Sequence, residues 1–312
     1  PIQPVYEDEL TGAYTQINVP GILAPNPVAT AKERKFNNAT SRLLGDIYAQ
    51  WEIIPDLKLK VSLGADVMYH KTNRYTPSNI YQSGGVASAY VGVNKSINWL
   101  NENTLTWNKT FAEEHDLSLL GGFTMQKNNA EYVMGSSSNF VNDVMLYNNL
   151  GAGSVYNKPE SNATQWSLMS YLARINYTLK HKYLFSVNAR VDGSSRFGTN
   201  NKYGFFPSLA AGWRISEEQF WKENENLSFI NNLKLKASYG ILGNNNIGNY
   251  PYQSVYSLGQ AQNYVFGGVY TQGAAVTTYV DPGLKWERTR TTDVGIETAF
   301  FNNCLLYTSP SP

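Results

Sequence analysis

Histidine and cysteine, which most often bind metals or carry out proton and acyl transfer, are few and widely separated in this sequence. The histidines are His70, His115 and His181, and Cys304 is the single cysteine. Neither a metal-ligand spacing nor an HExxH, GxSxG or P-loop motif occurs in the sequence. We therefore predict no catalytic residue, no metal site and no cofactor-binding site, and expect that the protein is not an enzyme.

The run RVDGSSRFG, residues 190–198, gathers polar groups that could be taken for an active site. A structural role explains them better than ligand contact, because Gly193 and Gly198 allow positive φ in a loop. Asp192 and Arg196 can pair with each other or bond loop backbone, and so fix where the chain leaves a strand. We predict structural roles for Arg190 and for these four residues.

A second polar run, GNNNIGN at residues 243–249, has a similar interpretation. Glycine and asparagine tolerate left-handed turns, so loop geometry accounts for Gly243, Asn244 and Asn245 without a ligand.

Aromatic residues in the following segment offer different chemistry. A tyrosine ring can stack on the apolar face of a sugar, and the alternative is packing within the loop. The candidate ligand or lid residues are Tyr250, Tyr252, Tyr256, Tyr264 and Tyr270.

The elements that must position these residues alternate in polarity with a period of two, which indicates β-strands. Residues 57–69 give the clearest case, with Leu59, Val61, Leu63 and Ala65 on one face and Lys58, Lys60, Ser62 and Asp66 on the other. Residues 183–192 and 205–215 alternate in the same way on either side of the RVDGSSRFG loop. Strands of about ten residues with one apolar and one polar face are typical of a membrane β-barrel, whereas sandwich strands are shorter.

The connections between the predicted strands alternate between short and long. Short ones fall near Pro55, Thr110, Lys180 and Glu217, and longer ones at 71–86, from Asn128, at 193–202 and from Asn244. Outer-membrane barrels have short periplasmic turns and longer extracellular loops, and a sandwich has no reason to sort its loops this way. We therefore predict an all-β fold, a segment of a large antiparallel transmembrane β-barrel with about nine strands.

Charge and hydropathy exclude other classes. There are 25 basic and 24 acidic residues, so nothing favours a nucleic-acid partner. No run of eighteen apolar residues occurs, which excludes a helical membrane protein. Charges of both signs on the predicted lumen face argue against an ion-selective pore and could instead bind a plug domain or stay solvated. They are Asp46, Glu52, Lys58, Lys60, Asp66, Arg174, Arg190 and Arg214.

Four stretches in order, RVDGSSRFG, YGFFPSLAAGWRISEEQF, LKLKASYGILGNNNIGNY and LKWERTRTTDVGIETAFFNN, resemble the SusC/RagA family of TonB-dependent outer-membrane transporters. The resemblance is strongest over residues 170–303. It implies a signal peptide, a plug domain, a large plugged barrel, a SusD-like surface lipoprotein and the TonB complex. It also implies import of a glycan or oligosaccharide, or of a peptide, across the outer membrane of a Gram-negative, Bacteroidetes-like cell.

Under this interpretation residues 1–303 form part of one barrel domain embedded in outer-membrane lipid, and the plug is not included. The resemblance ends after Asn303, so residues 304–312 look like a non-native tail, and the strand ending at Phe301 is expected to lack its next neighbour. The alternative function is a passive porin or an adhesin-type barrel.

Overall fold

The computed structural model describes residues 6–8, 10, 13–15, 26–80, 83–258, 260–301 and 304–308. The expectations that concern Asn303 and residues 309–312 lie outside these residues.

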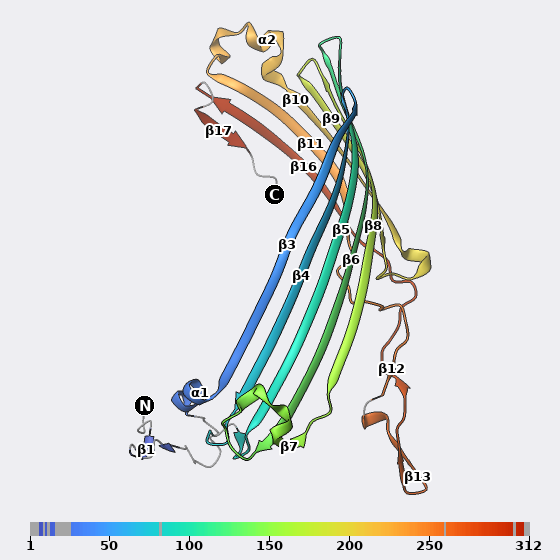
Figure 1. Cartoon of the computed structure of the whole chain (residues 1–312). Helices are drawn as coiled ribbons and strands as arrows, with labels where there is room; N and C mark the ends of the chain where they lie inside the picture. The colour runs from blue at the N-terminus through green and yellow to red at the C-terminus, as the bar shows by residue number, and fades with distance from the viewer. Residues whose placement is uncertain are drawn as a thin grey trace. The chain divides into compact units, whose positions relative to one another are not determined.

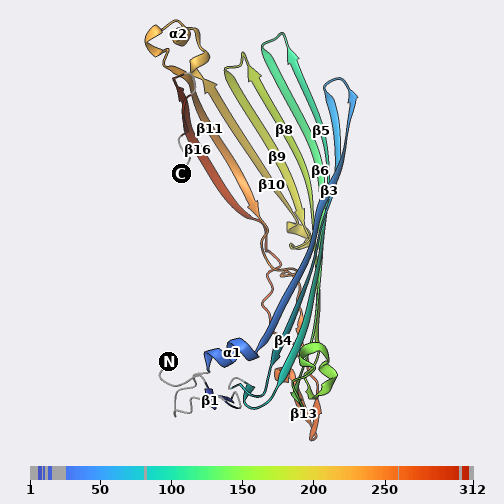
Figure 2. The same ribbon diagram turned by 60° about the vertical axis from the view of Figure 1, so that its left-hand side comes forward.

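The described chain is dominated by one antiparallel sheet with the order β3-β4-β5-β6-β8-β9-β10-β11-β16-β17, and β7 pairs with β6. Neighbouring long strands are mostly neighbours in sequence, and β9, β10, β11 and β16 lie side by side in both views (Figure 1, Figure 2). The strands are β3 (Lys35–Ile54), β4 (Leu57–Thr76), β5 (Ser88–Phe111), β6 (His115–Phe140), β7 (Gly153–Tyr156), β8 (Glu160–Leu179), β9 (Tyr183–Ser194), β10 (Tyr203–Arg214), β11 (Ile230–Asn244), β16 (Glu287–Phe300) and β17 (Leu305–Thr308).

Smaller elements occupy the connections. The helices are α1 (Pro27–Glu33) and α2 (Gln219–Lys222), with 3₁₀ turns at Leu146–Asn148, Leu150–Ala152, Thr199–Asn201, Ile215–Glu217, Glu225–Leu227 and Gln260–Gln262. Three two-stranded ribbons pair β1 (Tyr6–Asp8) with β2 (Ala13–Tyr14), β12 (Tyr256–Ser257) with β15 (Ala275–Val276), and β13 (Tyr264–Phe266) with β14 (Val269–Thr271).

The predicted all-β barrel segment is confirmed as an antiparallel sheet whose long strands match the nine expected from periodicity. Several strands are longer than predicted. β3 begins at Lys35, although its alternation of polarity starts only near Arg42, and β6 continues to Phe140 where a long connection was expected from Asn128. Residues 127–131, KNNAE, and 135–139, GSSSN, are polar or small on both faces, so the alternation fades while backbone pairing continues. Hydropathy marks where a strand contacts an apolar medium, not where its hydrogen bonds end.

The predicted alternation of short and long connections is confirmed for three tight turns and is wrong at Glu217, where residues 215–229 between β10 and β11 form a longer connection than residues 195–202 between β9 and β10. β3–β4, β5–β6 and β8–β9 are joined by tight turns, with positive φ at Asp56, at Ala112 and Glu113, and at Lys180 and His181. The connections at the opposite ends of these strands are longer, and the longest lies between β11 and β16.

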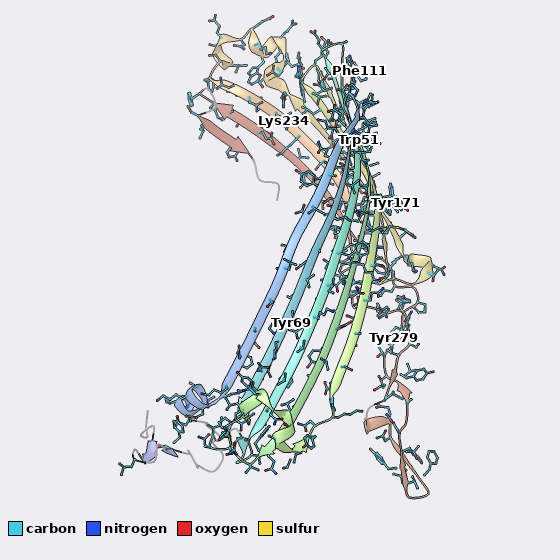
Figure 3. All side chains as sticks on the ribbon, in the orientation of Figure 1. Trp51, Tyr69, Phe111, Tyr171, Lys234 and Tyr279 are labelled. Carbon is cyan, nitrogen blue, oxygen red and sulfur yellow. The ribbon has the colours of Figure 1, made fainter. Side chains whose placement is uncertain are left out.

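The register gives the sheet one polar and one apolar face. Ser186, Ala210 and Ser238 are paired across β9, β10 and β11, as are Phe185, Ala211 and Ala237 on the other face. The polar face, as we use the term, holds even-numbered residues of β8–β11 and odd-numbered residues of β16; the apolar face holds the others. Lys234 marks the polar face and Tyr171 the apolar face (Figure 3).

The apolar face has the height expected of a membrane-spanning band. Along β10 it begins at Tyr203, continues through Phe205 and Leu209, and ends at Trp213, all partly or well exposed. Ten residue steps of about 3.3 Å at a tilt of about 40° give roughly 25 Å. Aromatic rings at both ends of an apolar stretch of this height are typical of interfacial girdles.

Residues 1–39 lack the periodicity of a regular element and would be expected to form a loop, but the structure has a helix at residues 27–33. Asn26 caps α1, since its side chain accepts hydrogen bonds from the backbone of Val28 and Ala29, and Pro27 occupies the first turn. The Asn-Pro pair is a helix-start signal that lies too close to the following strand for helical periodicity to develop.

The edge beyond β16 also differs from the prediction. β17 pairs with β16 from Phe300↔Leu305 to Glu297↔Thr308, so one end of β16 has a neighbour on both sides. In the described chain β3 and β17 end the strand order and do not pair with each other, so the sheet is not closed.

By contact density the chain divides into two units: residues 1–45, 65–98 and 128–165, and residues 46–64, 99–127 and 166–312. The first holds a small cluster of Tyr75, Ala87 and Ala89. The second holds the RVDGSSRFG and GNNNIGN motifs and the predicted tyrosines. No helix among the described residues is long and apolar enough to cross a membrane.

The register of β4 remains to be tested in the intact gene product. We expect a membrane-impermeant, water-soluble thiol reagent to label Lys60→Cys, on the polar face, and to spare Val61→Cys, on the apolar face. A slip of one residue would place two lysines in hydrocarbon at about 2–4 kcal/mol each near the midplane. Equal labelling of the two positions, in a protein that is folded by heat-modifiability, would show that this register is wrong.

Candidate functional site

The polar face carries a network of short hydrogen bonds along its strands. Ser186 donates to Asn176 at 2.7 Å, and Asn188 donates to Ser208 at 3.1 Å. The Arg174 guanidinium donates to Asn188 at 2.6 Å. These side chains come from β8, β9 and β10, so the register of the sheet alone brings them together.

Charges of both signs meet where β11 and β16 pair. Lys234 and Lys236 share the Glu297 carboxylate at 3.1 and 2.7 Å, and a hollow of about 440 Å³ lies before them. Ser238 donates to Asp293 at 3.4 Å beside this cluster. Two lysines and two carboxylates thus lie at or beside the same hollow, and their charges balance.

The predicted lumen charges of β3 and β4 form local contacts. Arg42 makes a two-pronged ion pair with Asp66, at 2.8 and 2.7 Å, and Lys60 lies over the Tyr48 ring at 4.5 Å. Glu52 accepts from the backbone of Asp56. Tyr48 and Lys60 therefore share a face.

An aromatic cluster joins three segments that are far apart in sequence. Phe197, Phe206 and Trp286 are 1%, 7% and 7% exposed, with ring centroids 5.1 Å (Phe197–Trp286) and 5.2 Å (Phe206–Trp286) apart. The Trp286 indole donates to the backbone oxygen of Lys202 at 2.9 Å. The cluster holds the 195–202 loop and the start of β16 against the polar face.

Two glycines make room for this cluster. A Cβ atom at Gly204 or Gly243 would overlap the Phe206 ring. The predicted structural role of Gly243 thus has a steric origin, and Gly204 is a functional position that sequence reasoning missed.

Arg196 connects the two polar motifs. Its guanidinium donates to the backbone oxygen of Asn245 at 2.9 Å and to the Asn249 side chain at 3.3 Å, and it lies over the Trp166 ring at 4.9 Å. Asn245 in turn donates to Ser194 at 3.2 Å. Burial lowers the pKa of Arg196, which no carboxylate of the described chain pairs with. We call these four contacts the Arg196 lock.

Two details of the predicted motif geometry are wrong, namely the left-handed conformations expected in each motif, and one of the two alternatives for Arg196 is confirmed. Gly193 lies within β9 and Gly198 has φ of -62°, so neither uses positive φ. Asp192 pairs with Arg190 at 2.6 Å, and Arg190 also donates to buried Ser170, so Arg196 takes the second predicted option, loop backbone. Residues 243–249 have no left-handed residue; instead the Asn244 side chain accepts from the backbone of Asn246 and donates to Glu287. Side-chain hydrogen bonds replace the backbone freedom that the composition suggested.

The five predicted tyrosines separate into two groups. Tyr256, Tyr264 and Tyr270 are 70%, 62% and 66% exposed, on the paired segments of residues 256–276, which we call the β12–β15 arm. Tyr250 and Tyr252 lie nearer the RVDGSSRFG loop, where Tyr252 contacts the space beside Gly198.

The arm is held by local contacts and leaves aromatic surface free. The Tyr264 and Phe266 rings are 4.7 Å apart, and Asn263 donates to the Tyr270 hydroxyl. The sequence reasoning missed Phe266 and also Tyr279, which lies just beyond the arm, and both side chains are exposed. Figure 3 labels Tyr279. Residues 251–280 contain no Asp, Glu, Lys, Arg or His, and this absence of charge was the available signal.

A compact charged cluster organises the connection between β10 and β11. The Glu218 carboxylate accepts from Tyr183 at 2.7 Å, Lys182 at 2.9 Å and the Trp213 indole at 3.0 Å. The Tyr183 hydroxyl, then the Lys182 ammonium and Trp213, lower the pKa of Glu218 from 4.5 to about 2. The cluster fixes this connection to the preceding hairpin.

The histidines and the cysteine lie apart from one another in the described residues. No group of three or more His, Cys, Asp or Glu side chains gathers there, and Cys304 is exposed with a free thiol. His115 bonds Tyr177 and His181 lies 3.5 Å from Asp116.

Comparison with known proteins gives a consistent result. Residues 5–308 match the family model described as "TonB dependent receptor-like, beta-barrel". TonB-dependent receptor P3 of Formosa agariphila is 36% identical over 94% of this chain and 29% of that protein. TonB-dependent receptor SusC of Bacteroides thetaiotaomicron is 31% identical over 97% of this chain and 31% of that protein.

A solved structure agrees in fold. The RagAB peptide transporter superposes with a TM-score of 0.80 at 27% identity, over 89% of this chain and 30% of that one. The chain thus spans about three tenths of the length of the relatives that it matches.

Removal of the Arg196 lock should loosen both loops. In the full-length protein we expect Arg196→Ala to raise hydrogen exchange in residues 194–202 and 245–249 about tenfold or more, because a lost hydrogen bond to a charged donor is worth about 1.5–3 kcal/mol. Arg196→Lys should have the same effect, because lysine lacks the planar, forked donor group of arginine. Arg174→Ala, which removes an arginine from the polar face, is the control. Unchanged protection of residues 245–249 in Arg196→Ala would contradict the lock.

The Glu218 cluster should weaken in acid. Since folding lowers the pKa of Glu218, its contribution to stability is complete above about pH 4.5 and is lost as the pH falls towards 2. We expect hydrogen exchange in residues 214–229, corrected for intrinsic rates, to rise over this range. Glu218→Gln should show raised exchange already at pH 7, whereas Glu225→Gln in the same connection should behave as wild type. A Glu218→Gln protein with wild-type exchange at pH 7 would refute the assignment.

Proposed function

Because the chain belongs to the TonB-dependent receptors and is part of a SusC-type β-barrel, we propose that it forms the middle-to-late barrel wall of an outer-membrane nutrient importer. The nutrient is a glycan or oligosaccharide in this proposal, and a peptide is the alternative. The relatives are about three times longer, so the further strands and the plug of such a protein are part of the proposal.

The two faces set the orientation. We place the polar face towards the lumen and the apolar face towards lipid, as a barrel wall requires. The Asp56, Ala112 and Lys180 turns and the Glu218 cluster then face the periplasm, and the Arg196 lock and the β12–β15 arm face outside. The open edges of β3 and β17 pair with further strands, since unpaired edges are not tolerated in lipid.

The partners follow from this placement. The mixed charges of the polar face, with Lys234 and Lys236 sharing Glu297, suit contact with a plug domain filling the lumen. A SusD-like surface lipoprotein would cover the outer end, and the TonB complex would supply energy from the periplasm. A passive porin or adhesin finds no support in the family match.

One observation carries the choice of nutrient: residues 251–280 expose aromatic rings and contain no charged residue or histidine. Rings such as those of Tyr256, Tyr264 and Tyr270 can stack on sugar faces. A surface without charges offers no ion pair to the termini of a peptide. RagAB is described as a peptide transporter, so the peptide alternative is a real outcome of the test.

Shortening the arm should reduce uptake. Tyr256 pairs with Val276 and Ser257 with Ala275, so a two-residue turn can replace residues 258–274 without separating the ribbon. In the full gene we expect this deletion to reduce uptake of a neutral oligosaccharide at least tenfold while surface amount and heat-modifiability stay normal. The matched variant Tyr256→Phe, which keeps the ring, should transport as wild type.

The results of this experiment distinguish the glycan assignment from the peptide alternative. Unchanged oligosaccharide uptake with normal surface expression would reject a role for the arm. Loss of growth on peptides with unchanged growth on oligosaccharides would overturn the glycan assignment in favour of peptide.

A further inference from the structure

A crevice of about 360 Å³ lies on the apolar face, at the end of the band that carries Tyr203. Its lining includes apolar and aromatic side chains from β5, β6, β8 and β10, together with polar ones such as Gln126, Ser167 and Ser194. The apolar and aromatic ones are Trp99, Met125, Met169 and Tyr203. Met169 and Tyr203 both pair with Gly193 on the apolar face, so we place the crevice outside the proposed nutrient path.

Gly193 lies in the wall of the crevice. It pairs directly with Met169 on one side and Tyr203 on the other, and a Cβ atom there would come within 2.5 Å of the Tyr203 ring. The ring therefore lies over the glycine, and the absence of a side chain at Gly193 lets Tyr203 take this position beside the hollow. Two flexible methionines border the hollow, and such side chains adapt to an alkyl chain.

Two lysines line the outer end of the crevice. Lys127 continues β6 beyond Met125, and Lys202 directly precedes Tyr203, and both line the same hollow as Ser167 and Ser195. Within the described chain no carboxylate lies within ion-pair distance of either ammonium group. Trp286 bonds the backbone oxygen of Lys202 at 2.9 Å and so fixes the chain at this point.

An apolar crevice with unpaired ammonium groups at its outer end matches an amphipathic anion. We propose that it binds a phosphate-bearing lipid of the surrounding membrane, with an acyl chain between Met125, Met169 and Gly193 and the phosphate between Lys127 and Lys202. The aromatic residues Trp99 and Tyr203 stand at the depth where headgroup and acyl chain meet. Lysines at a membrane surface attract anionic lipid. The inference rests on the proposed placement of the apolar face in the outer membrane.

Native mass spectrometry of the full-length protein in detergent tests the site. We expect wild type to retain added monophosphoryl lipid A in preference to phosphatidylcholine. The double variant Lys127→Gln/Lys202→Gln should bind the monophosphoryl lipid about 10- to 30-fold more weakly, from about 1 kcal/mol per lysine. Gly193→Val, which would displace the Tyr203 ring from the wall of the crevice and leave the lysines in place, should also weaken binding.

Lys58→Gln/Lys60→Gln is the matched control, because it removes two lysines from the polar face and should leave lipid binding unchanged. Equal losses in this control and in Lys127→Gln/Lys202→Gln would mean non-specific attraction and overturn the site. Full retention of the lipid by Lys127→Gln/Lys202→Gln would also overturn it. If millimolar inorganic phosphate alone displaced the lipid, the two lysines would form a site for a free anion. The proposal that the crevice binds an acyl chain would then be wrong.

Failure here is distinct from failure of the nutrient assignment. Oligosaccharide uptake reports on the arm, whereas retention of lipid is measured without any nutrient. A protein that transports normally and binds no lipid at this crevice would reject the lipid site alone.

Discussion

Backbone hydrogen bonding in a medium without water is the constraint on which the rest of this structure depends. Every strand that faces lipid needs a neighbour for its N–H and C=O groups, because an unpaired group there costs several kcal/mol. A meander meets this need with tight turns such as the one at Asp56. Pairing also fixes the register, and the register decides which side chains share a face.

The polar contacts are consequences of that register. Arg190 reaches Ser170 and Asp192 because β8 and β9 are aligned with Ser170 opposite Asp192. Phe206 fits between Gly204 and Gly243 because β10 and β11 stand in the register that Ser208↔Gly240 defines. A shift of one residue would turn Phe206 to the apolar face and remove the surface against which Trp286 packs. The loops are therefore shaped by strand pairing far more than by their own turn residues.

The architecture of the sheet could be predicted from the sequence, whereas the contacts of the loops could not. Period-two alternation and the sorting of connections predicted the nine long strands and their faces, since burial against an apolar medium leaves a local pattern. The extension of β6 to Phe140 was missed because hydrogen-bonded strands in water need no apolar face. The partner of Arg196 could not be predicted, because Asn245 offers a backbone oxygen, which every residue has. The glycines were assigned a conformational role, whereas Gly204 and Gly243 act through space that only the folded sheet defines.

The Arg196 lock also constrains the order of assembly. Arg196 is separated by 53 residues from Asn249, and Ser194 by 51 from Asn245, so the lock closes a long loop whose entropy must be overcome before its bonds form. Pairing of β9 with β10 and of β10 with β11 brings these ends together in steps of low contact order. The lock therefore closes late, after three strands stand in register, and a chain with one mispaired hairpin cannot close it. Its contacts require β9, β10 and β11 to stand in the observed register, so they report on the pairing of three strands at once.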